Sequence, residues 1–235
     1  MDQIPLKIIP RLPYSADAFI VHQGVREIYD FCCSQMLTES FRICVAYGAA
    51  QSGKTHLSIK LATDLERKGA LVRLVDGDSL QDFLVKQGVG AKYRSETVII
   101  VDDADKYLAT LSSDRSGEFV NLVEALRRSQ AGLLLLTGQQ VSDFAIDDHV
   151  RSRLRPGEGF LLSSPDDAQL NELIFTMAKQ RGIILTPKKV AYLAKRLGRE
   201  VPSLAKALNA LLVKSREGAD VDSFEVLASI SSADY

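Results

Sequence analysis

The sequence has few cysteines and no long apolar run, and both shortages exclude classes of protein. Cys32, Cys33 and Cys44 are too few for the disulfide framework of a small secreted domain. The adjacent pair is predicted as buried thiols on a helix rather than as a redox pair. A membrane-spanning helix needs a run of about eighteen apolar residues, and no stretch approaches that length. The N-terminus also lacks the basic segment followed by an apolar segment that is typical of a signal peptide. We therefore expect a cytoplasmic protein without a membrane segment.

A strong excess of positive charge is also lacking. The chain carries 29 Lys and Arg against 30 Asp and Glu, a net charge of −1. Domains whose main task is to coat nucleic acid are usually strongly basic, so that class is disfavoured and no sequence-specific DNA binding is expected. The 235 residues, of which 46% are hydrophobic, suit one large globular domain or a large one with a small one.

What the sequence does contain is a phosphate-binding loop, Gly48–Thr55 (GAAQSGKT), which matches G-x-x-x-x-G-K-[ST]. The two glycines let the backbone fold tightly, so that successive N–H groups point inward at a β-phosphate. Lys54 is placed to reach the β- and γ-phosphates, and Thr55 offers a hydroxyl to Mg²⁺. The positive end of the following helix faces the same anion. ADP or ATP with Mg²⁺ is therefore the predicted cofactor.

The residues around the loop have the order that the motif requires. Residues 43–47 form a short apolar run that contains β-branched residues, and Leu57, Leu61 and Leu65 recur at helical spacing after the loop. The alternative is a chance match, against which this order of strand, loop and helix argues.

Four more apolar runs predict further strands, and helical patterns separate them. Strands are expected at 71–75, 97–101, 132–136 and 159–162, and helices at 25–36, from a cap at Asp78 or Ser79 to Val85, and at 118–128. The runs at 97–101 and 132–136 are apolar throughout or nearly so, which is typical of strands buried on both faces. Five strands alternating with helices predict an α/β domain whose parallel sheet is covered on both sides.

From Ser164 onward only helical patterns appear. Ser164 is predicted as an N-cap with Pro165 at the first helical position, and further helices are expected to start at Thr186-Pro187, near Pro202 and at Ser223. The predicted organisation is an extended N-terminal peptide (1–14), an α/β nucleotide-binding domain (15–163) and a small all-α domain (164–235).

Two acidic residues follow the strand predicted at 97–101. Asp102, at the carboxyl end of that strand, can hold the hydration shell of Mg²⁺ beside Thr55. Asp103 is placed to orient an attacking water. The alternative is a surface Asp-Asp turn, and the combination with the phosphate-binding loop favours the catalytic interpretation.

Two other polar segments leave their interpretation open. The stretch Thr137-Gly138-Gln139 follows another predicted strand and is equally a contact to a γ-phosphate or an ordinary polar loop. Arg151, Arg153 and Arg155 alternate along the chain. They are either a solvated basic turn or the source of an arginine for a neighbouring subunit's nucleotide site. Spacing alone favours the basic turn.

The first fourteen residues are predicted to be extended, because Pro5, Pro10 and Pro13 interrupt any helix. The apolar segment Gln3-Ile4-Pro5-Leu6 lies within them. It is either a strand added to the domain or a short linear peptide for a partner's groove, and the residues alone do not decide between the two.

The motifs and their order resemble the DnaA-related branch of the AAA+ ATPases over about residues 16–230. The segments that carry the resemblance are Phe19-Ile20-Val21, Tyr47-Gly48, Gly53-Lys54-Thr55-His56-Leu57, Val101-Asp102-Asp103-Ala104, Ser152-Arg153-Leu154, Pro165-Asp166-Asp167 and Arg181-Gly182-Ile183. The initiators of this branch end in a helix-turn-helix DNA-binding domain. Because no such domain is expected in this chain, the resemblance favours the Hda type, the regulatory inactivators of DnaA.

The resemblance implies roles for individual residues. Phe19 and Ile20 would lie against the adenine, and Asp102 and Thr55 would serve Mg²⁺. The residues that would hold the phosphates are Gly48, Ala50, Gln51, Ser52, Gly53, Lys54, Thr55 and His56. Arg153 would act in trans to promote ATP hydrolysis on a DnaA partner.

The resemblance also bears on the N-terminal peptide. Hda-type proteins bind the DNA polymerase sliding clamp through a short N-terminal segment, which Gln3, Ile4 and Leu6 resemble without its usual aromatic end. This favours the partner-peptide interpretation over the added strand.

Two positions depart from the pattern of the branch. Gln51 stands where glycine is usual in the loop. Pro202 stands where an arginine at the start of the third helix of the small domain contacts the γ-phosphate, and neither Arg199 nor Lys206 is in register to replace it. The missing arginine argues for weak ATP hydrolysis by the protein itself. A protein whose role is to lend Arg153 to another ATPase would be less affected by this loss.

The expected function is therefore a nucleotide-bound regulator of chromosomal replication initiation. It would be recruited by the sliding clamp and would stimulate ATP hydrolysis by DnaA. The alternatives are an active AAA+ ATPase that acts as a helicase loader and a nucleotide-binding scaffold without trans-acting activity. Self-association stays open.

Overall fold

The computed structural model describes residues 16, 19–38, 40–50, 52–88, 90–111, 116–217 and 223–231. They group into two compact units, one that ends at Ser163 and one that begins at Ser164. None of the described helices is long and apolar enough to cross a membrane.

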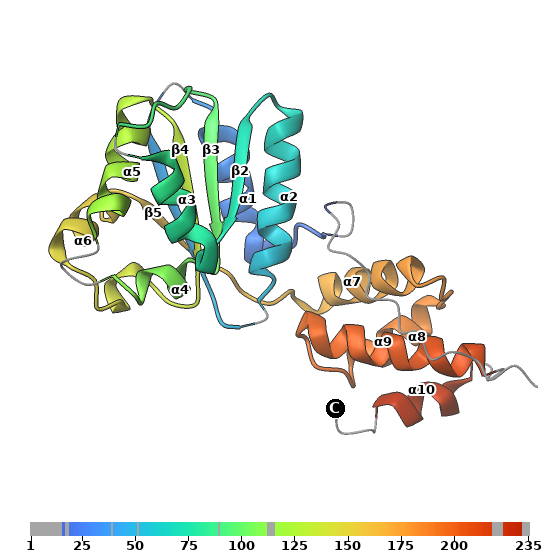
Figure 1. Cartoon of the computed structure of the whole chain (residues 1–235). Helices are drawn as coiled ribbons and strands as arrows, with labels where there is room; N and C mark the ends of the chain where they lie inside the picture. Colours follow the sequence, from blue (N-terminus) through green and yellow to red (C-terminus); the bar gives the residue numbers. More distant parts are fainter. Residues whose placement is uncertain are drawn as a thin grey trace, which may run out of the picture. The chain divides into compact units, whose positions relative to one another are not determined.

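A five-stranded parallel sheet in the order β2-β3-β4-β1-β5 forms the centre of the first unit (Figure 1). The strands are β1 (Arg42–Tyr47), β2 (Leu71–Asp76), β3 (Thr97–Asp102), β4 (Gly132–Thr137) and β5 (Glu158–Leu161). Every residue of β3 and β4 is buried, as expected for apolar strands covered on both faces. The prediction of a parallel sheet built from five strands is confirmed.

Helices cover both faces of this sheet (Figure 1). On one face, α1 (Gln23–Gln35) and α2 (Lys54–Arg67) pack through an apolar cluster that includes Ile28, Leu57 and Leu61. The helices that pack through the cluster on the other face are α3 (Leu80–Gln87), α4 (Ala104–Leu108), α5 (Gly117–Arg128) and α6 (Asp148–Leu154). The register places Tyr47 beside Thr137 and Asp76 beside Asp102, so the strand ends meet at one edge.

The segment 151–155 was expected to be a turn, but most of it belongs to α6. The Asp147 carboxylate accepts the N–H of Val150 at 2.9 Å and so caps the helix. Val150 and Leu154, one turn apart, are both buried in the core. A helix of seven residues offers too short an apolar period to be recognised among three arginines. The thiol prediction also needs one correction, because Cys33 is only partly buried while Cys32 and Cys44 are fully buried.

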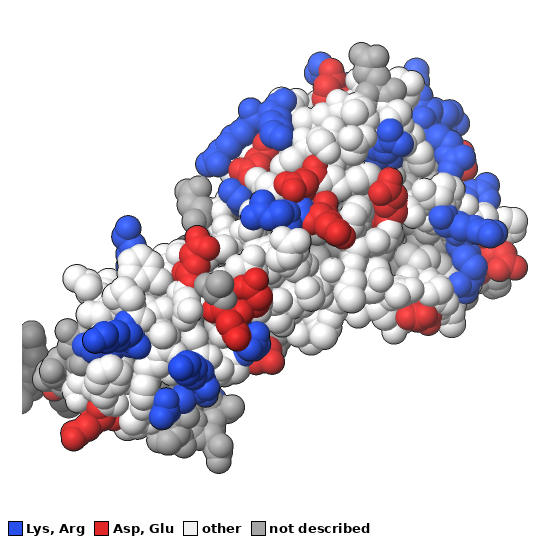
Figure 2. All heavy atoms as spheres, turned by 180° about the vertical axis from the view of Figure 1, so that it is seen from behind, with Lys and Arg blue, Asp and Glu red and all other residues white. Residues whose placement is uncertain are grey.

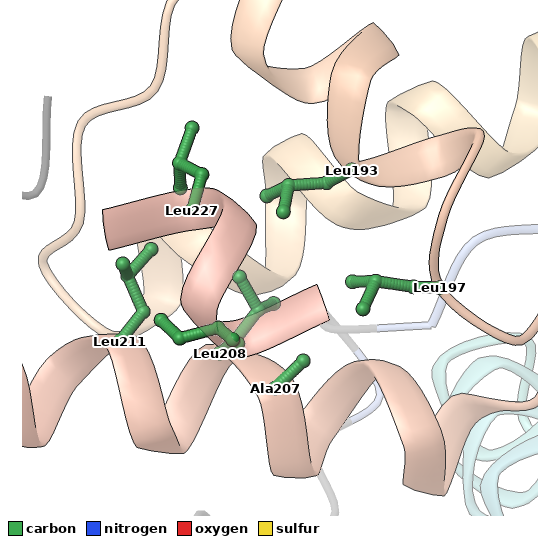
Figure 3. A pocket seen from close by; sticks show the side chains of 7 residues that line it. Leu193, Leu197, Ala207, Leu208, Leu211 and Leu227 are labelled. Carbon is green, nitrogen blue, oxygen red and sulfur yellow. The ribbon is translucent and has the colours of Figure 1, made fainter. Parts of the chain in front are cut away.

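All the secondary structure described in the second unit is helical. Its helices are α7 (Asp167–Gln180), α8 (Pro187–Ala194), α9 (Val201–Arg216) and α10 (Phe224–Ser231). Leucines from three of them converge in an apolar core, with Leu193 of α8, Leu208 and Leu211 of α9 and Leu227 of α10 facing one another (Figure 3). The space between them is too small for a water molecule, so this core is packed rather than built to hold a ligand.

The predicted start of α7 is wrong by two residues. Asp166, not Ser164, is the N-cap: its carboxylate accepts the N–H of Gln169 at 2.8 Å, and the Gln169 side chain accepts the Asp166 N–H at 3.3 Å. This capping box satisfies two N–H groups at once. Asp166 has Gln169 three residues later, whereas Ser164 has Asp167, so the capping box forms at Asp166 and Pro165 precedes the helix instead of opening it.

Candidate functional site

The loop between β1 and α2 turns at Gly53, whose φ of 93° lies in the left-handed region that glycine adopts without steric cost. The Gly48 N–H donates to the Thr137 carbonyl at 3.1 Å and ties the loop to the end of β4. Within the loop, the Ser52 N–H donates to the Ala49 carbonyl at 3.2 Å. The described residues of this loop, 48–50 and 52–53, therefore form a compact turn that leads directly into α2, which begins at Lys54.

Lys54 bends back over this loop. Its Nζ donates to the carbonyls of Gly48 and Ala49, at 2.9 Å in each case, and the residue is only 9% exposed. A buried ammonium needs hydrogen-bond partners, and these two carbonyls supply them. The positive charge is thereby held against the backbone of the loop.

Two features of the loop fit a phosphate. The Ser52 Oγ is buried and has no hydrogen-bond partner in the described part of the chain. In addition, α2 begins without a side-chain cap, so its first N–H groups, which have no partner within the helix, can donate to an anion. Together with the Lys54 ammonium, these donors match what a nucleotide's phosphates need. Gln51 lies outside the described residues.

Thr55 and Asp102 meet at the carboxyl ends of the strands, and a Mg²⁺ site requires these two side chains to be this close. The Thr55 hydroxyl hydrogen-bonds to the Asp102 carboxylate, which also accepts the Asp103 N–H at 3.2 Å. Burial raises the pKa of Asp102 above its ordinary value, against the Thr55 hydrogen bond that lowers it, and the charges of Asp103 and Asp76 raise it further. A divalent cation would offset the cost of this buried charge, and hydroxyl and carboxylate oxygens are its preferred ligands.

Asp102→Asn is expected to stabilise the nucleotide-free protein at neutral pH. The pKa of Asp102 is higher in the folded protein than in the unfolded chain, so the folded protein binds the carboxyl proton more tightly. The free energy of unfolding therefore falls as the pH rises from the unfolded pKa through the folded pKa. The amide removes that cost while it keeps an acceptor oxygen. The gain in Tm at pH 7 should therefore shrink toward pH 4, near the ordinary aspartate pKa of about 3.9. Thermal melts of both proteins at the two pH values measure it, and a variant less stable than wild type at pH 7 contradicts it.

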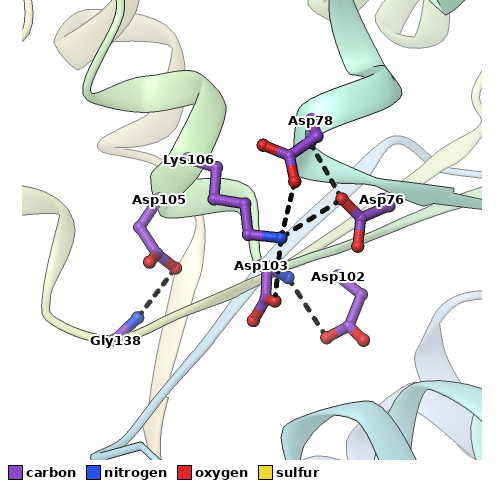
Figure 4. A network of polar contacts seen from close by, with 7 residues as sticks. All are labelled: Asp76, Asp78, Asp102, Asp103, Asp105, Lys106 and Gly138. Atoms are coloured by element: carbon purple, nitrogen blue, oxygen red, sulfur yellow. Dashed lines mark hydrogen bonds and ion pairs between the residues drawn. The ribbon is translucent and has the colours of Figure 1, made fainter.

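Lys106 lies at the centre of a carboxylate network that the sequence analysis did not identify (Figure 4). Its Nζ is 2.8 Å from Asp78 Oδ2, 3.4 Å from Asp103 Oδ2 and 3.5 Å from Asp76 Oδ1. The hydrogen bond to Asp78 is the largest cause that raises the pKa of Lys106, and Asp76 and Asp103 add to it. The Asp103 carboxylate, proposed to orient water, is thus paired with an ammonium group.

A close approach of β2 and β3 at their ends makes this network possible. A Cβ at Gly77 would lie 2.1 Å from the Asp103 carbonyl oxygen, so only glycine fits there. Asp103 itself has a φ of 48°, which turns the chain sharply after β3. The repeated pattern of an aspartate at the end of each of these strands was a sequence signal for the network, but pairing them requires the order of the sheet.

The polar stretch after β4 is engaged within the fold. Thr137 is fully buried, and its hydroxyl donates to the Gln139 carbonyl at 2.8 Å. The Gly138 N–H donates to Asp105 Oδ1 at 3.1 Å, which links this stretch to α4 (Figure 4). The Gln139 side chain donates to the Asp143 carbonyl at 3.4 Å. These contacts favour the interpretation as an ordinary polar loop.

The remaining predicted cofactor contacts lie on α2 and before α1. Phe19 and Ile20 are partly buried, and Phe19 packs against the apolar cluster that α1 and α2 share. His56 lies in the first turn of α2, and burial lowers its pKa, so that its imidazole is neutral at physiological pH.

Arg151 is a structural residue of the first unit. Its Nη1 donates to the Ser142 carbonyl at 3.3 Å, and its Nη2 donates to the carbonyls of Phe144 and Ile146 at 3.0 and 3.3 Å. These bonds tie α6 to the segment that precedes it. Arg155, in contrast, is exposed just after the helix ends.

Arg153 has a different environment from Arg151 and Arg155. Residues two apart are separated by a rotation of about 200° around the helix axis, so they lie on nearly opposite sides of the helix. The Nε of Arg153 lies 3.2 Å from Glu124 Oε1 of α5, and its Nη1 donates to Ser152 Oγ at 3.1 Å. Glu124 is a partner that the sequence analysis missed, since nothing in the local pattern of α5 distinguishes it.

Gln3, Ile4 and Leu6 lie outside the described residues. In the second unit, α9 begins at Val201, so Pro202 stands in its first turn. Arg199 lies before that helix and pairs with the Asp167 carboxylate.

On the face that Figure 2 shows, basic and acidic side chains lie interspersed rather than separated by sign. This is the surface expected from a net charge of −1, and it differs from the basic face of a domain that coats nucleic acid.

No family profile matches the chain. In sequence it is similar to the chromosomal replication initiator protein DnaA 2 of Protochlamydia amoebophila, 24% identical over 220 residues, which are 89% of this chain and 48% of that protein. It is also similar to DnaA of Gluconobacter oxydans, 23% identical over 219 residues, 85% of this chain and 44% of that protein. The chain thus spans less than half the length of these relatives, to which it is related at low identity.

Solved structures show the same architecture. Domain III of the Thermotoga maritima replication initiation protein DnaA superposes with a TM-score of 0.72 at 19% identity, covering 94% of this chain and 97% of that one. AMPPCP-bound DnaA from Aquifex aeolicus gives 0.68 at 18% identity, with 89% and 68% covered. The Thermotoga maritima RuvB Holliday junction branch migration motor gives 0.68 at 17% identity, with 93% and 71% covered. The fold is therefore that of an AAA+ P-loop protein.

Proposed function

We propose that this protein is a nucleotide-bound regulator of chromosomal replication initiation, recruited by the sliding clamp, that stimulates ATP hydrolysis by the DnaA initiator through Arg153. The placement of Arg153 carries the proposal. It comes shortly before β5 starts, and in a parallel sheet the strand starts lie opposite the strand ends that carry the phosphate-binding loop. Its partners are Glu124 and Ser152 rather than loop residues, which supports service to another molecule's site.

The loop supports a resident nucleotide, ADP or ATP. Lys54, Ser52 Oγ and the uncapped start of α2 would hold its phosphates, with Thr55 and Asp102 serving Mg²⁺. Phe19 and Ile20 would lie against the adenine. The related DnaA from Aquifex aeolicus is described with bound AMPPCP, which is consistent with this assignment.

Other residues favour weak hydrolysis by the protein itself. Pro202 occupies the first turn of α9, and the nearby Arg199 is engaged by Asp167. The Asp103 carboxylate is paired with Lys106. An AAA+ protein that holds a nucleotide and lends its arginine to a partner does not need these groups for its own catalysis.

An active ATPase such as a helicase loader is the second candidate, and the contact between Thr55 and Asp102 favours it because the elements of a Mg²⁺ site are present. Steady-state ATP turnover by the isolated protein separates the two. The regulator should turn over slowly, whereas a motor should hydrolyse ATP continuously and respond to nucleic acid.

The decisive test is ATP hydrolysis by the initiator, with and without this protein and with clamp loaded on DNA. The regulator should accelerate hydrolysis only when the loaded clamp is present. A nucleotide-binding scaffold without trans-acting activity would leave the rate unchanged.

Deletion of residues 1–9, or Gln3→Ala combined with Leu6→Ala, is expected to abolish clamp binding with little change in Tm. A peptide that inserts apolar anchors into a groove loses its affinity with those anchors, while a proline-rich terminus contributes little to the core. Surface plasmon resonance on immobilised clamp measures binding, with Lys7→Ala as the control outside the motif. A truncated protein that melts early and still binds the clamp would show that the segment is structural.

A further inference from the structure

The guanidinium of Arg153 is held from one side by its own chain. Its Nε lies 3.2 Å from Glu124 Oε1, and Nη1 donates to Ser152 Oγ at 3.1 Å. Both side chains of the ion pair are about two-thirds buried, at 31% and 37% exposure. The pair is therefore sheltered enough to favour one orientation of the arginine over the many that an exposed side chain samples.

The contacts leave part of the guanidinium unengaged. A guanidinium has five N–H groups in a planar fork, and these two contacts, its hydrogen bonds within the described part of the chain, use two of them. The three others are all on the terminal nitrogens. The inner edge is thus bound, while the terminal nitrogens keep the geometry that pairs bidentately with phosphate oxygens.

The two helices that carry the pair are firmly placed. Leu122 and Leu126 of α5 and Val150 and Leu154 of α6 belong to one buried cluster. The Asp147 cap and the three carbonyl bonds of Arg151 further fix α6. A side chain braced between such elements keeps its position to within the small tolerance that catalysis requires.

We infer that Glu124 is a positioning residue: it holds the inner edge of the Arg153 guanidinium so that the terminal nitrogens are presented to the phosphate oxygens of a partner's nucleotide. The inference rests on the proposed function, because it concerns the same arginine. It adds a second residue, on a different helix, to the trans-acting apparatus.

Glu124→Ala is expected to reduce the stimulated rate of the initiator by about 10–100-fold, since small misplacements of a catalytic group have effects of this size. The concentration needed for half-maximal stimulation should stay unchanged, because docking does not depend on this contact. Glu124→Gln retains an acceptor oxygen and should keep most of the activity. Glu118→Ala is the matched control: Glu118 lies on the same helix but accepts its hydrogen bond from Gln81, at 3.1 Å.

A second measurement does not need the partner. The ¹⁵Nε–Hε resonance of Arg153 reports the order of the guanidinium, and the heteronuclear NOE should be high in wild type and in Glu124→Gln but low in Glu124→Ala. If Glu124 serves only stability, Glu124→Ala will lower Tm without changing the stimulated rate at saturating protein. That result overturns the inference. Stimulation that rises in both Glu124 variants overturns it as well, since Glu124 would then mask the arginine.

The outcomes separate the inference from the function on which it rests. If Arg153→Ala abolishes stimulation while Glu124→Ala stimulates at the wild-type rate, only the role of Glu124 is lost. If Arg153→Ala stimulates as well as wild type, the proposed function fails, and the role of Glu124 fails with it whatever the NOE reports.

Discussion

Arg153→Ala is expected to abolish the stimulation of initiator ATP hydrolysis, with a loss within the range of about 10³–10⁵ that arginines supplied to another protein's phosphoryl transfer contribute. The guanidinium would neutralise charge that develops on the transferred phosphoryl group, and alanine offers no substitute. Arg153→Lys should fail nearly as badly, because lysine keeps the charge but loses the planar fork. The assay is ATP hydrolysis by the initiator with clamp loaded on DNA and each variant in turn.

The controls for this experiment follow from the different surroundings of the three arginines. Arg155→Ala is the matched control, because Arg155 is exposed just beyond α6 and should be dispensable. Arg151→Ala is unsuitable: its guanidinium satisfies three backbone carbonyls, so its loss should lower Tm before any effect on hydrolysis can be interpreted. ADP affinity and clamp binding should survive Arg153→Ala. Full stimulation by Arg153→Ala would mean that the three arginines only form a basic end of α6 and do not act on the initiator.

Lys54→Ala is expected to weaken the binding of ADP and ATP by about 10–100-fold or more. A hydrogen bond to a charged group contributes about 1.5–3 kcal/mol, and its loss corresponds to a change in Kd of this size. Lys54 is the cation that the loop holds close to its backbone, and in a phosphate-binding loop this lysine reaches the β- and γ-phosphates. Isothermal titration calorimetry with each nucleotide measures the change.

Lys60→Ala is the matched control for that titration. Lys60 lies on the same helix, six residues further along, and pairs with Asp64 at 3.0 Å, so its loss removes a lysine of α2 without touching the loop. Its affinity for nucleotide should equal that of wild type. Wild-type affinity in Lys54→Ala would mean that the loop does not bind phosphate.

The elements that were predicted well are those with a strong local pattern. β3 and β4 are apolar almost throughout, and the stripe of Phe119, Leu122, Val123 and Leu126 marks α5, so period and polarity suffice. The short helices α4 and α6 were missed because five or seven residues hold less than two turns of apolar period. Start positions were less certain for the same reason, as the capping box at Asp166 shows.

The candidate site divides in a similar way. The residues of the loop are contiguous, so their proximity follows from the chain itself, and Asp102 follows from its place at a strand end. The contacts of Lys106 with Asp76 and Asp78 depend instead on which strand neighbours which, and the contact of Glu124 with Arg153 depends on how α5 packs against α6. Such contacts join residues about thirty positions apart, and no local period encodes them.

The strand order has a consequence for the synthesis of the chain on the ribosome. β1 is made first, yet its two neighbours are β4 and β5: Arg42 pairs with Gly132, and Cys44 pairs with Glu158. Until those segments emerge, β1 has no partner within the sheet, and its unpaired edge resembles the exposed strand edges that promote aggregation. Nascent chains that end before Glu158 should therefore be the species that ribosome-associated chaperones retain longest, and release should coincide with the emergence of β5.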